Sequence, residues 1–561
     1  MKKIFFHLTV VLFLTSLAYS QIENVPLANP VYDYLKEMQV KGITPGFDDA
    51  NPNLSRFEVV NFLNKIDGHR RELSKTEISL LDRYRIEFDS KMQNDKNTFS
   101  FFKGKMGLGE RLSNAFSNKN KNLYETSVSG ANLTLDFLGN LYISKEIKPN
   151  IKYNASIMDG GVRARGTLFD HLGYFLTWNK GVVIGQKDIA LLTLPILKAD
   201  FKFNEDKESN INYDFVSGYL KYHIEPIDNF NISLQFGREK MTHGYGYGSK
   251  LILSGDSPDM DFFKLNAGYG VIKYTFVHAS TVGDFNLDMS KRYTKFWAYQ
   301  RLTLSLENLF DCSFGANVVY ARPFEFAYLN PILFFGFAEK SLQDRDNKNI
   351  FLDFQTKFLK NIQFQGTLYL DDDQQFSFVT GISNINEKTA VQIGTFIYEP
   401  IGLKDLSLAF EYTKIRPYVY SHFDIKSDYT AYGISLGHPI GPNADQFFSR
   451  LTYNLNDWIR MGLEYSFTRK GNNIYDSTGL LVKNVGGDIK VPFRYDGVDD
   501  PNATFLEGDR VNTNAFAASL RIIPIKNFIF TFKYYYQIEK QLSTGRKNDQ
   551  SYFYMYMNVD Y

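Results

Sequence analysis

The last ten residues of the chain, 552–561, alternate between two kinds of side chain. Apolar and aromatic groups occupy every second position, at Phe553, Met555, Met557, Val559 and Tyr561. Because successive side chains of a strand point to opposite faces, these five share one face. A final strand with an apolar face and an aromatic last residue is typical of a bacterial outer-membrane β-barrel, whose wall it closes. We therefore expect this face to meet lipid.

The same period of two runs through most of the chain from about Leu123 onward. Leu406, Leu408 and Phe410 alternate with Ser407 and Glu411. Similar alternation recurs at residues 132–137, 231–236, 302–307 and 462–467. A soluble β-sandwich would also permit such segments, but roughly 440 residues of short strands exceed what one sandwich holds and suit one large barrel. We predict an all-β transmembrane barrel of about 18 antiparallel strands.

The first twenty residues have the pattern of a secretory signal peptide. Lys2 and Lys3 precede an apolar run from Ile4 to Ala18, and Ser20 ends a small-residue cleavage site. An uncleaved membrane anchor is the weaker alternative, because the run is shorter than the roughly 20 apolar residues of a spanning helix. No later run reaches 18 apolar residues and the mean hydropathy is −0.29, so helical membrane spans are not expected.

The segment that follows has a helical period. Ser55 with Glu58, and Ser74 with Glu77, form two capping boxes, in which hydroxyl and carboxylate satisfy free N–H groups of a first helical turn. A third amphipathic stripe begins at Val31. We divide the chain into a signal peptide (1–20), a periplasmic helical bundle (21–95) and a barrel (96–561).

Two connections between the expected strands indicate the orientation of the barrel. Pro524–Asn527 makes a tight turn, as periplasmic connections do, whereas about 40 residues from Arg469 to Val511 form a long loop rich in Gly, Asn and Asp. Long loops of this kind face outward. Between residues 414 and 430 the pattern is ambiguous and the sequence does not fix the strand register.

Several motifs, taken in order, resemble known families. Residues 41–63 are similar to one surface-layer-homology unit, although we expect a structural plug or periplasmic foot here and not a wall-binding site. The remaining motifs resemble the outer-membrane capsule-assembly (Wzi) family, with His243 where that family usually has tryptophan. These motifs are 236–249, 251–258, 321–325, 329–331, Glu339, 346–347, 353–354, 369–373, 411–422 and 437–442. The resemblance implies an 18-stranded barrel with an N-terminal helical bundle, and a role in holding or organising surface polysaccharide.

Polysaccharide retention needs aromatic faces for sugar C–H surfaces and polar groups for hydroxyls. The long loop carries such a set, which we take as the candidate ligand-binding residues: Phe493, Arg494, Tyr495, Asp499 and Asp500. A solvated loop with ordinary turn chemistry is the alternative interpretation. A second group of charges near strand positions, Arg322, Glu325, Glu339 and Asp372, is expected to pair inside the lumen.

The chain carries no His-Glu-x-x-His or Walker-type motif, and its eight His residues are scattered. Asp371, Asp372 and Asp373 could bind Ca²⁺, but an incidental acidic turn fits better, because calcium ligands come at spaced positions. We therefore expect no enzyme, no metal and no cofactor. A barrel hydrolase would need a nucleophile and base at the outer rim, and the sequence locates neither.

The net charge of +1 gives no reason to expect nucleic acid. The expected partners are capsular or extracellular polysaccharide and outer-membrane lipid, with the chain as a monomer in the outer membrane of a diderm bacterium. A porin-like diffusion channel is the alternative function, since a barrel of this strand number is wide enough to enclose water.

Overall fold

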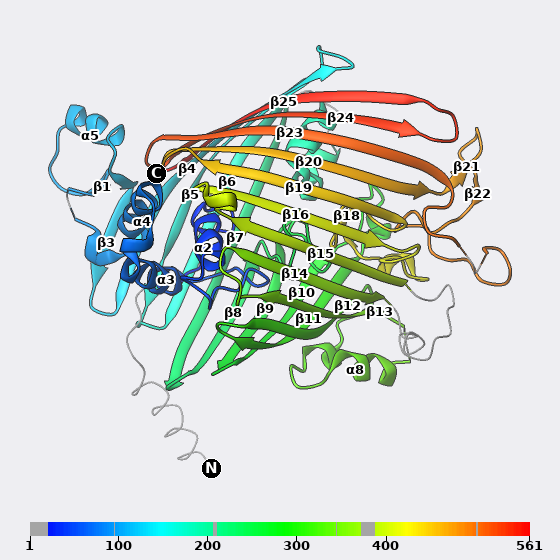
Figure 1. Ribbon diagram of the computed structural model, residues 1–561, viewed down its shortest axis with the longest axis horizontal. Helices are drawn as coiled ribbons and strands as arrows, with labels where there is room; N and C mark the ends of the chain where they lie inside the picture. Colours follow the sequence, from blue (N-terminus) through cyan, green and yellow to red (C-terminus); the bar gives the residue numbers. More distant parts are fainter. Residues whose placement is uncertain (1–20, 95, 206–209, 344, 372–387, 501–502) are drawn as a thin grey trace.

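The computed structural model shows a closed β-barrel with a helical domain at one end and long loops at the other (Figure 1). It describes residues 21–94, 96–205, 210–343, 345–371, 388–500 and 503–561. The expected signal peptide lies outside these residues. Among the described residues, eighteen antiparallel strands form the wall, as the sequence predicts.

The wall strands follow chain order around the barrel. They are β4 (Ala131–Lys148), β5 (Asn154–Leu168), β6 (Leu172–Gly185), β7 (Asn210–Ile227), β8 (Phe230–Glu239), β9 (Met260–Tyr269), β10 (Ile272–Val282), β11 (Thr294–Leu306), β12 (Phe310–Tyr320), β13 (Asn347–Thr356), β14 (Ile362–Asp371), β15 (Lys388–Tyr398), β16 (Leu406–Ile415), β19 (Ala444–Asn454), β20 (Ile459–Asn472), β23 (Asp509–Ile525), β24 (Phe528–Gln541) and β25 (Lys547–Asp560).

Closure of the barrel depends on the last strand. β25 pairs with β4, for example Tyr556 with Tyr142, while the short β3 (Tyr124–Val128) continues along the edge of β4 where β25 ends. Phe553 is exposed on the outer surface, whereas Tyr552 and Tyr554 are buried on the inner side. The prediction is therefore confirmed for Phe553, but Tyr561, assigned to the same face, is buried against Phe99 and Ala115 of the N-terminal region.

Large apolar side chains project from the outer wall on many strands. They include Leu176, Trp178, Leu302, Leu352 and Phe516. An apolar belt on a closed wall is the surface that a bilayer requires, and the chain is an outer-membrane protein.

None of the helices in the described part of the chain is long and apolar enough to span a membrane.

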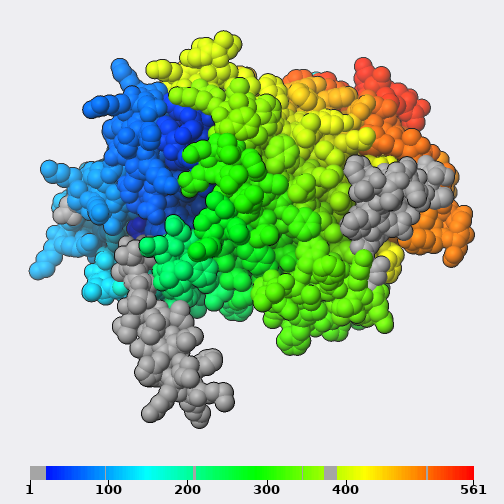
Figure 2. All heavy atoms as spheres, turned by 60° about the horizontal axis from the view of Figure 1, so that its bottom comes forward, coloured from blue at the N-terminus to red at the C-terminus, as the bar shows by residue number. Residues whose placement is uncertain are grey.

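Three helices near the N-terminus pack into a domain at the short-turn end of the barrel. They are α2 (Val31–Val40), α3 (Arg56–Gly68) and α4 (Lys75–Phe88), and both capping boxes form as predicted. Val31, Leu35, Leu63 and Leu81 are among the side chains of their shared core. In Figure 2 these residues, in dark blue, occupy one end of the molecule, and the orange loop near β21 and β22 lies at the other end.

Two segments fold into the lumen from the opposite end. Residues 240–259 and 416–443 contribute Leu251, Tyr420 and Tyr429 to a core that also contains Trp297 and Phe351 of the wall. The rings of Tyr420 and Tyr429 stack 5.1 Å apart, and their hydroxyls donate to the carbonyls of Leu251 (2.7 Å) and Ile252 (2.8 Å). The ambiguous stretch 414–430 therefore leaves the wall after β16 and becomes part of the lumen filling.

The connections at the two ends differ in length, as expected. β23 and β24 are joined by residues 526 and 527 alone, whereas β20 and β23 are joined by 36 residues, 473–508. The remaining elements belong to these connections or to the N-terminal region: β1 (Thr98–Ser100), β2 (Asn120–Asn122), β17 (Thr430–Ala431), β18 (Ile434–Ser435), β21 (Ile474–Tyr475), β22 (Leu481–Lys483), α5 (Leu108–Ala115), α6 (Lys187–Thr193), α7 (Phe201–Glu205), α8 (Phe335–Ser341), η1 (Arg70–Glu72), η2 (Ser90–Met92), η3 (Pro195–Ala199), η4 (Met289–Lys291), η5 (Phe326–Leu329), η7 (Pro400–Gly402) and η8 (Ile425–Ser427).

Candidate functional site

A small polar pocket lies at the outer rim, above the ends of β13, β14 and β15. Its volume is about 200 Å³, and we call it the rim pocket. It is lined by Asp346, Asn347, Lys348, Asp371, Lys388, Ser421, His422, Phe423, Pro492, Phe493 and Tyr495. Ligand pockets typically measure roughly 300–1,000 Å³, so this one suits a short part of a larger molecule.

Two of the predicted ligand-binding residues form one wall of the rim pocket. The rings of Phe493 and Tyr495 meet edge to face at 5.0 Å, and Phe493 also packs against Tyr418 at 5.5 Å. Tyr495 remains 65 % exposed. The loop therefore presents a supported pair of aromatic rings to the pocket.

Two other predicted residues hold the loop together. The Arg494 guanidinium contacts the Asp499 carboxylate at 2.6 Å, and the same carboxylate accepts from the Arg494 backbone N–H (2.8 Å) and the Asn484 side chain (2.8 Å). Burial by itself would raise the pKa of Asp499, but the hydrogen bonds from Arg494 hold it below its ordinary value. This pair fixes the turn that carries Phe493 and Tyr495. Asp500 is exposed and does not line the pocket.

Three of the four charges expected in the lumen lie behind the rim pocket. Arg322 pairs with Glu325 (2.8 Å) and with Asp346 (2.8 Å), and Glu339 of α8 pairs with Lys348 (3.1 Å). The expected pairing is present, but the location differs from the expectation. α8 packs on the outer side of the wall, against Val318 and neighbours, because residues 321–343 fold outward over β10–β12. Asp372 lies outside the described residues.

These ion pairs hold two charged residues of opposite sign, Asp346 and Lys348, in the lining of the rim pocket. Asp346 is held by Arg322 and by the hydroxyl of Tyr328 (2.8 Å), while Lys348 is held by Glu339. Sequence reasoning did not assign Asp346, Lys348, Lys388 or His422 to a site. They are distant in sequence from Phe493, and only the barrel rim brings them together. The available signal for Asp346 and His422 was their place in the family motifs at 346–347 and 411–422, whereas Lys348 and Lys388 lie in neither.

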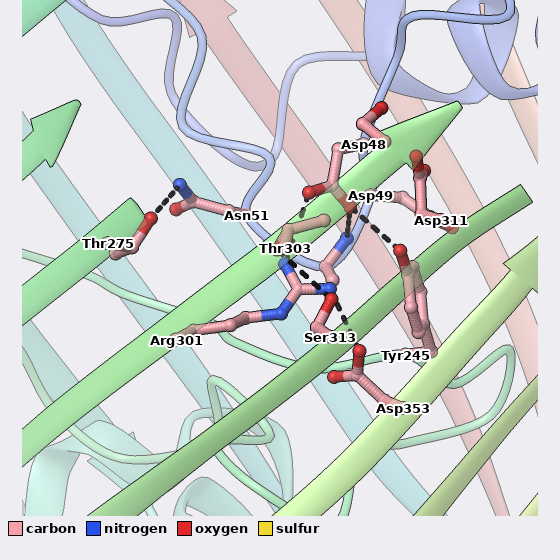
Figure 3. A network of polar contacts seen from close by, with 12 residues as sticks. Asp48, Asp49, Asn51, Tyr245, Thr275, Arg301, Thr303, Asp311, Ser313 and Asp353 are labelled. Carbon is pink, nitrogen blue, oxygen red and sulfur yellow. Dashed lines mark hydrogen bonds and ion pairs between the residues drawn. The ribbon is translucent and has the colours of Figure 1, made fainter. Parts of the chain in front are cut away.

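The opposite end of the lumen is occupied by the loop between α2 and α3 (Figure 3). Asp48 of this loop contacts Arg301 of β11 at 3.1 Å and accepts from the Tyr245 hydroxyl at 3.2 Å. Arg301, 2 % exposed, also pairs with Asp353 of β13 at 3.0 Å. Buried charges are stable only when paired in this way. The network fastens the loop of the helical domain to the inner face of the wall.

A larger apolar groove, of about 850 Å³, lies on the outer wall between β16 and β25. Leu406, Leu451, Leu463 and Phe532 line it. These are outward, lipid-facing positions, so the groove belongs to the membrane belt and not to the polar site.

Comparison with known proteins agrees with this architecture. Residues 86–496 match the family described as "Capsule assembly protein Wzi". The chain belongs to the Wzi capsule-assembly family. No curated protein matches the sequence.

Among the similar solved structures, one has a TM-score that shows the same fold. It is Wzi of Escherichia coli, described as an outer-membrane protein involved in group 1 capsule assembly and a carbohydrate-binding β-barrel, with a TM-score of 0.55 and 12 % identity. The match covers 96 % of this chain and 99 % of the other. OprD of Pseudomonas aeruginosa has a TM-score of 0.43 and 11 % identity, covering 76 % and 95 % of the two chains. OccAB1 of Acinetobacter baumannii has values of 0.43 and 9 %, covering 77 % and 97 %.

Family membership confirms the resemblance drawn from the motifs and favours a capsule-assembly role over a diffusion channel. The substitution of His243 for the usual tryptophan is accommodated by stacking. Its ring lies 4.5 Å from that of Tyr299 and 5.9 Å from that of Trp297. An aromatic layer is thus kept within the lumen core.

Proposed function

We propose that this Wzi-family barrel holds capsular or extracellular polysaccharide at the cell surface without catalysing a reaction, and that the rim pocket contacts the polymer. The observation that carries the proposal is the meeting of Phe493 and Tyr495 with Asp346, Lys348 and Lys388 at the outer rim. Family membership and the carbohydrate binding described for the Escherichia coli protein support it.

The chemistry of the pocket suits one unit of a sugar chain. Aromatic faces pack against sugar C–H surfaces, while carboxylates, amides and ammonium groups exchange hydrogen bonds with hydroxyls. Lining charges of both signs allow the pocket to accept neutral or acidic sugars. A polymer can engage many barrels at once, so weak binding by each protein is enough to retain it.

The test removes the two rings and measures binding of polysaccharide purified from the cells that make the protein. For Phe493→Ala/Tyr495→Ala we expect the dissociation constant to rise about tenfold or more, equivalent to about 1.4 kcal/mol or more. Heat-modifiable migration should remain that of a folded barrel, because neither ring lies in the wall.

The matched control is Tyr475→Ala, which removes a half-exposed tyrosine from the same loop but outside the rim pocket. This variant should bind like the wild type. Equal binding by the double variant and the wild type would show that the rim pocket does not contact the polymer.

A further inference from the structure

The barrel wall changes height between β7 and β8. The lower part of β7 pairs with β8 from Gly218–Arg238 to Ile227–Phe230. The upper part, residues 210–217, pairs only with β6 on its other side. Within the described residues no strand covers this upper edge of β7, because the chain leaves β8 at Glu239 and enters the lumen. The edge exposes backbone donors and acceptors beside the lumen.

A cavity of about 420 Å³ lies at this free edge. Its lining includes Tyr213 and Phe215, which face inward, and also Asp214 and Val216, which face outward. Successive residues of a strand point to opposite faces. The cavity therefore lies along the free edge of β7, where no paired strand separates the lumen from the outer surface. We call it the side opening.

The inner part of the side opening has the composition of a sugar site. The Asp159 carboxylate accepts hydrogen bonds from the side chains of Asn140 (2.6 Å), Asn179 (3.3 Å) and Tyr213 (2.9 Å). Inward side chains of four adjacent strands supply aromatic and polar groups around it: Asn140, Tyr142, Asp159, Thr177, Asn179, Tyr213, Phe215 and Ser217.

The connection between β6 and β7 bounds the opening from the lumen side, because its Leu197 and Phe203 pack with the inward residues Ile211 and Tyr213. The Asp200 carboxylate accepts from the backbone N–H of Asp214 at 3.2 Å, where a strand partner would otherwise bond, and from that of Phe203 at 2.9 Å. Phe201, Pro258 and Asp259 also line this part of the opening. The connection therefore narrows the opening on its lumen side.

The charges of the side opening are mostly negative. Four carboxylates, Asp159, Asp200, Asp214 and Asp259, line it. Asp214 is paired with Lys202 at 3.4 Å, and the lining cation, Arg238, is paired with Asp261 at 2.6 Å. Carboxylates accept hydrogen bonds from hydroxyl and amine groups but repel uronates and phosphates. The lining therefore selects neutral or amine-bearing sugars.

We propose that the side opening binds a short stretch of saccharide without negative charge, lying across the free edge of β7 between the lumen and the outer leaflet. This inference rests on the proposed function only in taking a saccharide as the ligand. The saccharide is part of the surface polymer or the sugar headgroup of a glycolipid in the outer leaflet, since both carry the same hydroxyl chemistry.

The experiment measures binding of a neutral oligosaccharide and of a uronate-containing one to the purified full-length protein. Ser217→Trp fills the opening from an inward position, and Phe201→Ala/Asp259→Ala removes contacts in connections outside the wall. Leu220→Trp is the matched control, because it adds the same ring to the outward face of β7. We expect both test variants to bind the neutral oligosaccharide at least about tenfold more weakly, and the control to bind like the wild type.

Nanodiscs with and without lipopolysaccharide distinguish the two sources. Loss of bound lipopolysaccharide in Ser217→Trp identifies the glycolipid, and loss of polymer binding in both kinds of disc identifies the polymer. Wild-type binding of every ligand by both test variants would overturn the inference, as would equal affinity of the wild type for neutral and uronate sugars. If the rim-pocket variant alone loses binding, the inference fails while the proposed function stands.

Discussion

At the scale of single residues, Asp499 links electrostatics to loop structure. Its pKa is lowered by its bonds to Arg494, so the folded loop favours the carboxylate. A lowered carboxyl pKa contributes stability above the unfolded value of about 3.9, and the contribution is lost as pH falls through the folded value. We expect polymer binding to be steady from about pH 5 to 8 and to weaken below about pH 4 as the loop loosens.

Asp499→Asn provides the comparison, since it keeps the shape of the side chain but not its charge. This variant should bind several-fold more weakly at neutral pH and lose part of the acid dependence. Titrating polymer affinity against pH for both proteins makes the measurement. Superimposable profiles would show that the Arg494–Asp499 pair does not position the aromatic rings.

Single residues also show how much of the candidate site can be predicted from sequence. Phe493 and Tyr495 are predicted ligand contacts because aromatic faces pack against sugar C–H surfaces, and both line the rim pocket. Arg494 and Asp499 were selected for the same loop but stabilise its turn, which composition alone does not reveal. Lys348 and Lys388 were missed because their role arises from barrel closure, and short-range patterns contain no information about it.

At the scale of elements, the helical plug is tied to the wall by ion pairs on separate strands. Glu37 of α2 contacts Arg460 of β20 at 2.7 Å, and Asp48 contacts Arg301 of β11. When Glu37 is neutralised, Arg460 still pairs with Asp33. When Asp48 is neutralised, Arg301 still pairs with Asp353. We expect Glu37→Gln/Asp48→Asn to weaken docking by about 1–3 kcal/mol per pair without unfolding the barrel.

Ion conductance recorded in planar bilayers tests this prediction. Barrels of the double variant should show conducting events more often than wild-type barrels, because the plug spends more time displaced from the lumen. Asp67→Asn is the control, since Asp67 pairs with Arg70 and Arg85 inside the helical domain. Unchanged conductance in the double variant would mean that these two pairs do not limit release of the plug.

The elements themselves were predicted unevenly. Period-two alternation identified the wall strands, and capping boxes identified α3 and α4, because both signals are local. The sequence did not reveal that residues 240–259 and 416–443 enter the lumen. Such segments are apolar, as strands are, but they have no lipid-facing side chains to set their register. The register between 414 and 430 is therefore ambiguous from the sequence.

At the scale of the whole molecule, the fold divides the chain into a lipid-facing wall, a filled lumen and an outer rim. Length, strand count and the terminal strand predicted the barrel, because a bilayer demands that every backbone group be paired within a closed wall. The uneven wall height at β7 was not predictable, since it depends on where each strand ends. We propose that the outer rim that this division creates is where the polymer is held.

The most direct test of that claim compares cell-bound with shed polysaccharide in cells whose own gene is deleted. Complementation with the wild-type chain should restore cell-bound polymer, whereas Phe493→Ala/Tyr495→Ala, present at equal levels in the outer membrane, should leave most of it in the medium. Equal retention by the two complemented strains, or no loss of polymer on deletion, would contradict the account.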